Sequence, residues 1–118
     1  MNAGLIKTFV AASAVTARRI VKFTAAGKIE HATAGTDNSV GVSNRVGDVA
    51  ADDRVDVHLS RTTEVEAGAA IAYGVSVAAG ADGKAVPAVA GDVAVGFAVG
   101  DATADGDILD ILLVRHKV

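Results

Sequence analysis

The stretch "VDVHLSR" at residues 55–61 returns in altered form near the end of the chain, as "LDILLVR" at residues 109–115. The two copies lie roughly half a chain length apart in a sequence of 118 residues. In both copies, every second residue is apolar, which is the pattern of a β-strand because successive side chains point to opposite faces. Two copies of one strand predict an internal repeat, provided that the surrounding residues repeat as well.

The surrounding residues do repeat, in the same order. Two copies are too few for a solenoid, which needs at least about three stacked units. We therefore predict two related β units that share one core, at about residues 14–61 and 69–115, inside a single domain at 14–118. Residues 1–13 form a separate N-terminal segment or arm in this interpretation. The aligned pairs are "FTAAGKI" (23–29) with "AAGADGKAV" (78–86), "SVGVSNR" (39–45) with "AVGFAVG" (94–100), and "GDVAADDRVDVHLSR" (47–61) with "GDATADGDILDILLVR" (100–115).

Short alternating segments fill the rest of the chain. They are rich in Val or Ile, and Gly or Asp separates them at roughly 8–12-residue spacing, which is typical of a sandwich or small barrel. Asp82-Gly83 predicts a hairpin turn, and Pro87 predicts a sheet edge or strand end. The fold class is therefore all-β: a small β-sandwich or barrel of two duplicated units with short antiparallel strands and little or no helix. The further strand candidates are residues 4–10, 17–24, 38–44, 62–66, 73–79, 84–89 and 93–100.

The composition limits the classes of function. Hydrophobic residues make up 51% of the chain but aromatic residues only 3%, so Ala, Val and Gly carry the apolar fraction. Small side chains bury less apolar surface per residue, so a partner surface is expected to complete the core. The net charge of −3, without a basic stripe or stacking aromatics, argues against direct nucleic-acid binding. The chain has no cysteine, and no apolar run is long enough to span a membrane.

Two segments are candidates for contact with other proteins. In the second copy, both faces of the strand are mostly apolar, which predicts a strand that is central in its sheet or covered by a neighbouring chain. Leu112 and Val114 are the candidates on its second face. The N-terminal segment offers an apolar strip that is either an ordinary first strand or an arm that adds a strand to another subunit. Its candidate contact residues are Leu5, Ile6, Phe9 and Val10.

The sequence lacks the motifs of catalysis and metal binding. His31, His58 and His116 fall on separate predicted elements and do not have the spacing of a metal pair. The Gly-Lys pairs lack the other residues of a phosphate loop, and no G-x-S-x-G motif occurs. The stretch "DATADGD" (101–107) lacks the glutamate that completes a calcium loop, so its acids are interpreted as turn formers. We therefore expect no catalytic residue, metal or cofactor, and not an enzyme.

The order of these elements resembles the small capsid decoration proteins of tailed bacteriophages, also called head cement or minor capsid proteins. The resemblance lies in an Ala-Gly-rich turn, a G-x-V strand, a D-G-K hairpin, a G-x-A strand and a closing alternating strand. It covers roughly residues 14–118. The sequence departs from the family pattern at Tyr73-Gly74, where family members often have Gly-Asp before the strand that follows the Ala-Gly turn. The departure leaves the detailed register of this strand open. The matching elements lie at residues 67–71, 74–77, 82–84, 96–98 and 107–114.

The resemblance implies a structural virion protein. Such a protein is made in the bacterial host cytoplasm and sits on the outer surface of the phage head. There it binds the major capsid protein, as a homotrimer, and stabilises the shell without a membrane, nucleic acid or small-molecule substrate. Two alternatives remain open: another phage structural module of the tail or baseplate, and a small β-barrel ligand-binding protein, which would need a pocket with converging polar groups.

Overall fold

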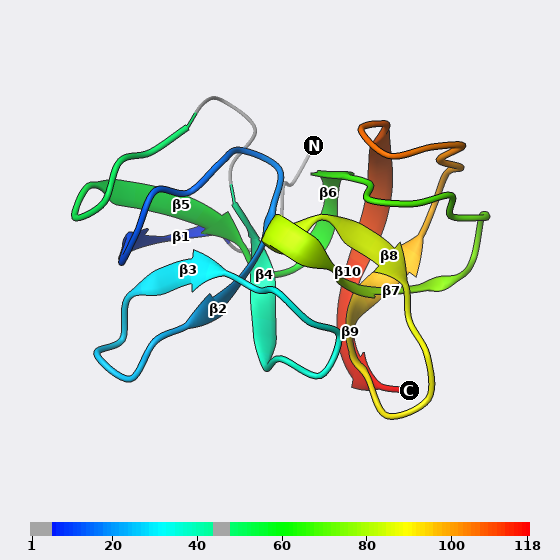
Figure 1. Ribbon diagram of the computed structural model, residues 1–118, viewed down its shortest axis with the longest axis horizontal. Coiled ribbons are helices and arrows are strands. Elements are labelled where there is room, and N and C mark those ends of the chain that lie inside the picture. The colour runs from blue at the N-terminus through cyan, green and yellow to red at the C-terminus, as the bar shows by residue number, and fades with distance from the viewer. Residues whose placement is uncertain (1–5, 44–47) are drawn as a thin grey trace.

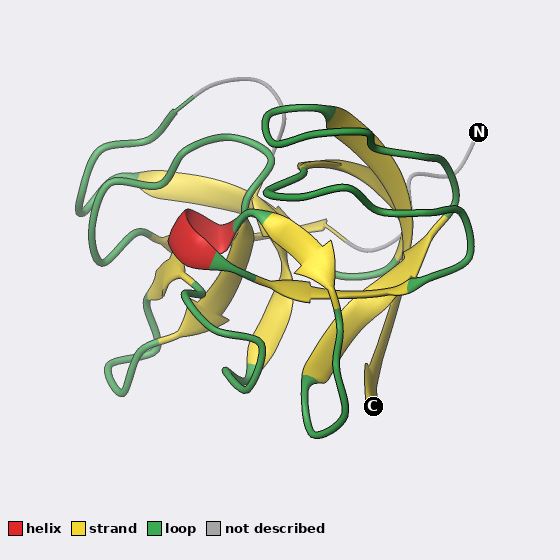
Figure 2. Cartoon of the chain, turned by 45° about the vertical axis from the view of Figure 1, so that its right-hand side comes forward, coloured by secondary structure: helices red, strands yellow, loops and turns green. Residues whose placement is uncertain are grey.

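The computed structural model describes residues 6–43 and 48–118, which form an all-β protein (Figure 1). This confirms the fold class expected from the alternating pattern. Apart from one helical turn, the described chain consists of strands and loops (Figure 2). The elements in chain order are β1 (Ile6–Val10), β2 (Ile20–Phe23), β3 (Ile29–His31), β4 (Ser39–Ser43), β5 (Arg54–His58), β6 (Arg61–Glu66), β7 (Ser76–Ala79), the turn η1 (Ala81–Gly83), β8 (Ala85–Pro87), β9 (Val93–Ala98) and β10 (Ile108–Lys117).

The strands form two five-stranded antiparallel sheets with the same topology. The order is β1-β5-β4-β2-β3 in one sheet and β6-β10-β9-β7-β8 in the other. If β1 is matched with β6 and the others follow in chain order, the two orders are identical. We call β1–β5 the first unit and β6–β10 the second unit; they lie side by side (Figure 1).

Each sheet curls until its two edges meet. Just after β1, Ala11 forms an isolated parallel bridge with Ile29 of β3, and Ala67 forms the equivalent bridge with Ala85 of β8. The next amide in each unit donates to the same strand: Ala12 to the Ile29 carbonyl and Gly68 to the Ala85 carbonyl, both at 2.7 Å. These bonds occupy part of each sheet edge, which would otherwise be open to pairing with other chains. The protein is thus two small, partly closed barrels.

Backbone conformation repeats even where the residue type changes. Three pairs of matching positions adopt a positive φ, the left-handed region that glycine enters without a steric cost. In two of the three pairs, the first unit places a side chain where the second has glycine. The pairs are Arg18 (60°) with Gly74 (85°), Gly27 (79°) with Gly83 (72°), and Asp52 (69°) with Gly106 (94°).

The units begin earlier in the chain than the sequence repeat indicated. β1 pairs with β5 from Ile6↔His58 to Val10↔Arg54, so it is an edge strand of the first sheet. β6 has the same place beside β10 in the second sheet. The three-residue strand β3 was not among the predicted strands, because three residues are too few to show an alternation. Pro87 ends β8, at a sheet edge as expected.

The buried side chains form two clusters that do not coincide with the two units. The smaller cluster lies within the first unit and includes Val21, Ile29 and Val57. The larger cluster fills the second unit, but it also contains Ile20, Ala32 and Val42 of the first unit. Ile20 and Val21 are neighbours in β2, and their side chains enter different cores because strand side chains alternate between faces. The first unit therefore completes the core of the second.

Candidate interaction surfaces

The second sheet presents an apolar surface to solvent. Along β10, Leu109, Ile111 and Leu113 are buried, while the alternate residues point outward. Of the outward residues, Asp110 is charged and exposed, and the apolar Ile108, Leu112 and Val114 are 46%, 37% and 44% exposed. Phe97 of β9 lies opposite Leu112 in the register and is half-buried. We call Phe97, Ile108, Leu112 and Val114 the outer face of the second unit.

His116 lies at one border of this outer face and contacts Phe97. The His116 ring stacks on the Phe97 ring with centroids 4.5 Å apart. Its Nδ1 lies 2.6 Å from the Val114 carbonyl oxygen, which can only accept, so Nδ1 carries the proton in the neutral ring. Nε2 then accepts from the Ser76 hydroxyl at 3.0 Å. Phe97 is held in place by these contacts and is a preorganised part of the surface.

The first unit presents an aromatic surface at the end of its barrel. Phe9 and Phe23 meet edge to face, with ring centroids 5.1 Å apart and an interplanar angle of 69°. The Lys7 ammonium lies 5.8 Å from the centre of the Phe9 ring, which is within the range of a cation–π contact. Phe23 is 46% exposed. We call Phe9 and Phe23 the aromatic end of the first unit.

Three of the predicted contact residues, Phe9, Leu112 and Val114, belong to these two surfaces. Leu112 and Val114 lie on the outer face, and β10 is both central in its sheet and apolar toward solvent. Ile6 and Val10 lie on β1, where Ile6 is exposed, and Phe9 belongs to the aromatic end. Leu5 lies outside the described residues. Their contact with a partner stays a prediction.

Sequence reasoning missed Phe23 and Phe97 as surface residues. Phe97 lies in the alternating stretch "VAVGFAVG" (93–100), which shows a strand but not which face is open. Phe23 could have been found from the repeat itself, since it aligns with Ala79 and a change from alanine to phenylalanine requires a different environment.

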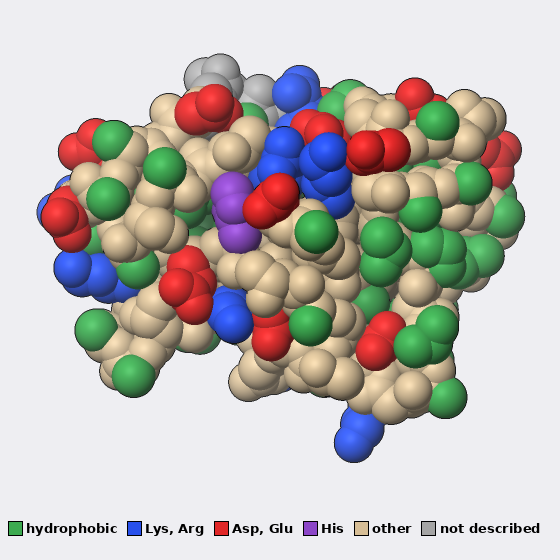
Figure 3. Space-filling model, viewed as in Figure 1, with side chains coloured by type: hydrophobic (Ala, Val, Ile, Leu, Met, Phe, Trp, Pro, Cys, Tyr) green, Lys and Arg blue, Asp and Glu red, His purple; other side chains and the backbone are tan. Residues whose placement is uncertain are grey.

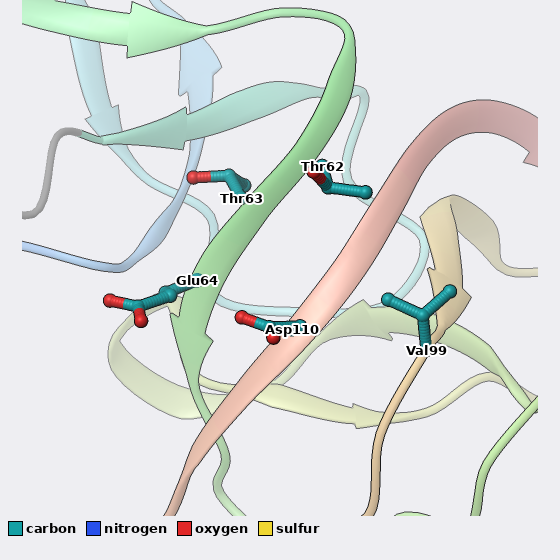
Figure 4. A pocket seen from close by; sticks show the side chains of 5 residues that line it. All are labelled: Thr62, Thr63, Glu64, Val99 and Asp110. Carbon is teal, nitrogen blue, oxygen red and sulfur yellow. The ribbon is translucent and has the colours of Figure 1, made fainter. Parts of the chain in front are cut away.

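A shallow hollow lies beside the outer face, between β6 and β10 (Figure 4). Its lining includes the side chains of Thr62, Glu64, Val99 and Asp110. Glu64 lies opposite Asp110 in the register, and its Oε1 is 3.2 Å from Nε of Arg18 in the first unit. One of the two carboxylates is therefore already neutralised by an arginine. Among the described residues, no three His, Cys, Asp or Glu side chains are grouped so that they could hold a metal ion.

Charged side chains connect the two units. Glu66 of β6 accepts from Arg19 of the first unit at 3.2 Å and lies 3.4 Å from the Lys84 ammonium, which also contacts Asp105 at 3.0 Å. Hydrogen bonds to Asp105, and then to Glu66, raise the pKa of Lys84 above its usual value. Basic and acidic side chains gather between the units in Figure 3. We call Arg18, Arg19, Glu64, Glu66 and Lys84 the ionic junction.

The acids of the stretch at 101–107 bond to the protein itself. Asp101 accepts from the Tyr73 amide at 2.8 Å, and Asp105 pairs with Lys84. Asp107 accepts from the Thr103 amide at 2.9 Å and hydroxyl at 2.8 Å, which lowers the pKa of Asp107. These contacts agree with the interpretation of the acids as turn formers.

Comparison with known proteins gives the family. A sequence profile of the family described as "Phage cement protein" matches residues 1–116. The chain belongs to the phage cement protein family. Among solved structures, it is similar to "head fiber gp8.5 N base in bacteriophage phi29", with 28% sequence identity and a TM-score of 0.73 over 97% of each chain. No curated protein sequence matches it.

Family and structural likeness together make this chain a phage head structural protein, which belongs to the virion. The resemblance noted from the turn and strand order is thereby confirmed. In the part of the chain that the structure describes, no helix has the length and apolar character needed to cross a membrane.

Proposed function

We propose that this protein decorates the phage head as a homotrimer, binding the outer surface of the major capsid protein shell and stabilising it. The single observation that supports this most is the match of the cement family to nearly the whole chain. A cement protein acts by binding, so this role requires no catalytic group. Many copies on one shell add their individual affinities through multivalency.

The structure supports a role in binding through its rigidity and its surfaces. The two units share one core, so the protein can transmit force between two attachment points without a hinge. The aliphatic outer face and the aromatic end are apolar surfaces of the kind that protein contacts bury. The hollow at Glu64 and Asp110 is open and partly neutralised, which favours a binding protein over an enzyme or ligand carrier.

The test is binding to heads of the phage that encodes the protein. Heads lacking the protein are incubated with it, sedimented, and analysed by quantitative mass spectrometry and cryo-electron microscopy. We expect saturable binding at a fixed ratio to the major capsid protein, density on the outside of the shell, and greater resistance of the heads to heating. Copies found only on tails or baseplates in purified virions would overturn the proposal and favour the alternative structural module.

A further inference from the structure

The contact between the two units joins two different surfaces. The first unit contributes the outward side of its sheet, where Ile20 of β2 pairs with Val42 of β4 and both are fully buried. The second unit contributes the end of its barrel, at the hairpin from Ala79 to Ala85. Gly83 of that hairpin lies so close to Ile20 that an added Cβ would be 2.5 Å from the Ile20 carbonyl oxygen. The contact is therefore a face of one unit against an end of the other.

Each unit thus has both a sheet face and a barrel end of this type. Within the chain, the first unit uses only its face and the second unit only its end. In the second unit, the positions that match Ile20 and Val42 are Ser76 and Phe97, which pair with each other in the same way; Phe97 belongs to the outer face. In the first unit, Phe23 matches the buried Ala79 of the second. The outer face and the aromatic end are therefore the two unused counterparts of an interface that the chain already forms once.

We propose that a second copy of this chain covers the outer face with its aromatic end, so that the contact within the chain is repeated between chains. The interface is head-to-tail, because the two surfaces that meet are different. Such an interface leaves one face and one end open until a ring closes. This inference rests on the proposed homotrimer, in which three chains would form a ring of six similar units.

The charges support the assignment. Within the chain, Arg18 and Arg19 of the first unit face Glu64 and Glu66 of the second. In the proposed interface between chains, the second unit takes the place of the first, and the positions that match Arg18 and Arg19 hold Gly74 and Val75. On the other side of that interface, the positions that match Glu64 and Glu66 hold Thr8 and Val10. Both members of each Arg–Glu pair are replaced together, so the repeated contact leaves neither an arginine nor a glutamate of these pairs without its partner, which would be costly if buried.

The aromatic side chains support it as well. Inside the chain, the buried end has Val65 and Ala79, against which the first unit packs. The matching Phe9 and Phe23 are larger and remain partly exposed. Aromatic residues supply much of the binding energy at protein interfaces, and a partner surface would also complete a core that is poor in large side chains.

The experiment uses two single variants, each of which places a charge on one of the two surfaces. Leu112→Glu alters the outer face, and Phe23→Glu alters the aromatic end. Ala104→Glu is the matched control, since Ala104 is an exposed loop residue outside both surfaces. Circular dichroism and thermal unfolding check that each variant is folded, and analytical ultracentrifugation gives its mass. We expect each of the two variants to weaken self-association at least about 100-fold, as a buried unpaired charge would, and the control to assemble like wild type.

Mixing the two variants tests the head-to-tail geometry. The intact aromatic end of Leu112→Glu can bind the intact outer face of Phe23→Glu, so the mixture should form a one-to-one dimer, although neither variant associates alone. An interface between like surfaces would give no such complementation. If wild type is trimeric and the mixture stays monomeric, this interface is wrong and the trimer stands.

Two other results would also overturn the inference. A wild-type protein that stays monomeric at about 100 μM, far above the Kd of a stable oligomer, would refute both the interface and the trimer, whereas the head-binding assay would still decide decoration. A trimeric Leu112→Glu that no longer binds heads would show that the outer face contacts the capsid instead of a second copy.

Discussion

The imidazole of His31 accepts a hydrogen bond that only its unprotonated Nε2 can accept. The donor is the Thr16 amide, at 2.9 Å. Burial lowers the pKa of His31 below 6.5, the Arg19 charge lowers it further, and Asp82 and Asp48 act weakly in the opposite direction. The unfolded chain therefore takes up a proton more readily than the folded chain. We predict full stability above about pH 6.5 and a loss as the pH falls from there toward the folded pKa.

Urea unfolding at about pH 7.5 and about pH 5.5 measures this loss, with His31→Gln as the comparison. The variant cannot titrate at this position, so its free energy of unfolding should change less between the two conditions. Asp37 does not interfere, because the Thr33 amide and other donors lower the pKa of Asp37 below 3.8, so that its contribution is lost only in more acidic solution. Equal pH dependence in the two proteins would contradict the prediction.

Among the elements, the hairpin that contains η1 acts both as a turn and as part of the contact between units. Gly83 and its match Gly27 both have a positive φ, so alanine at either position costs about 1 kcal/mol in backbone strain. An alanine Cβ at Gly27 would meet nothing within 4 Å, whereas one at Gly83 would clash with the Ile20 carbonyl. We predict that Gly83→Ala destabilises the protein by about 1–3 kcal/mol more than Gly27→Ala. Chemical denaturation of both variants measures their free energies of unfolding. Equal losses of stability would show that the backbone at the contact between units can shift to accommodate the added Cβ.

How far the elements could be predicted depended on their length and repetition. The alternation in β10 and β5 was long enough to identify both strands and, through their likeness, the duplication. β3 has only three residues, and the alternation of β1 did not show whether it pairs within its own chain. Its pairing with β5 depends on contacts across about half the sequence, which local patterns do not encode.

The candidate surfaces were predicted only in part, for a related reason. Leu112 and Val114 could be identified because an outward apolar pattern is visible along a single strand. The partner of Ile20 could not be identified, because Ile20 and Val42 look like core residues of their own unit and instead pack into the other one. A duplicated sequence shows which surfaces correspond, but it does not show which of them is covered within the chain.

At the scale of the whole molecule, the shared core predicts that the two units unfold together. Ile20 and Val21 are adjacent and fully buried, but Ile20 packs into the core of the second unit and Val21 into that of the first. Ile20→Ala should cost about 2–5 kcal/mol, since it leaves a cavity at the contact between units. The protein should still unfold in a single transition, because the core of the second unit is incomplete without the residues that the first unit contributes.

Hydrogen exchange resolves this prediction strand by strand. In Ile20→Ala, the slowest amides of β7 and β9 should lose as much protection as those of β4, although the substitution lies in the first unit, because global unfolding sets the exchange of all of them. Val21→Ala is the matched comparison: it removes a side chain from the core of the first unit and leaves the contact between units intact. If β7 and β9 keep their protection in Ile20→Ala, or if two transitions separate on denaturation, the second unit is stable without the first. The protein would then be two linked barrels, joined by the ionic junction and by backbone hydrogen bonds such as those from the Glu66 amide to the Arg18 carbonyl and from the Val93 amide to the Gly35 carbonyl.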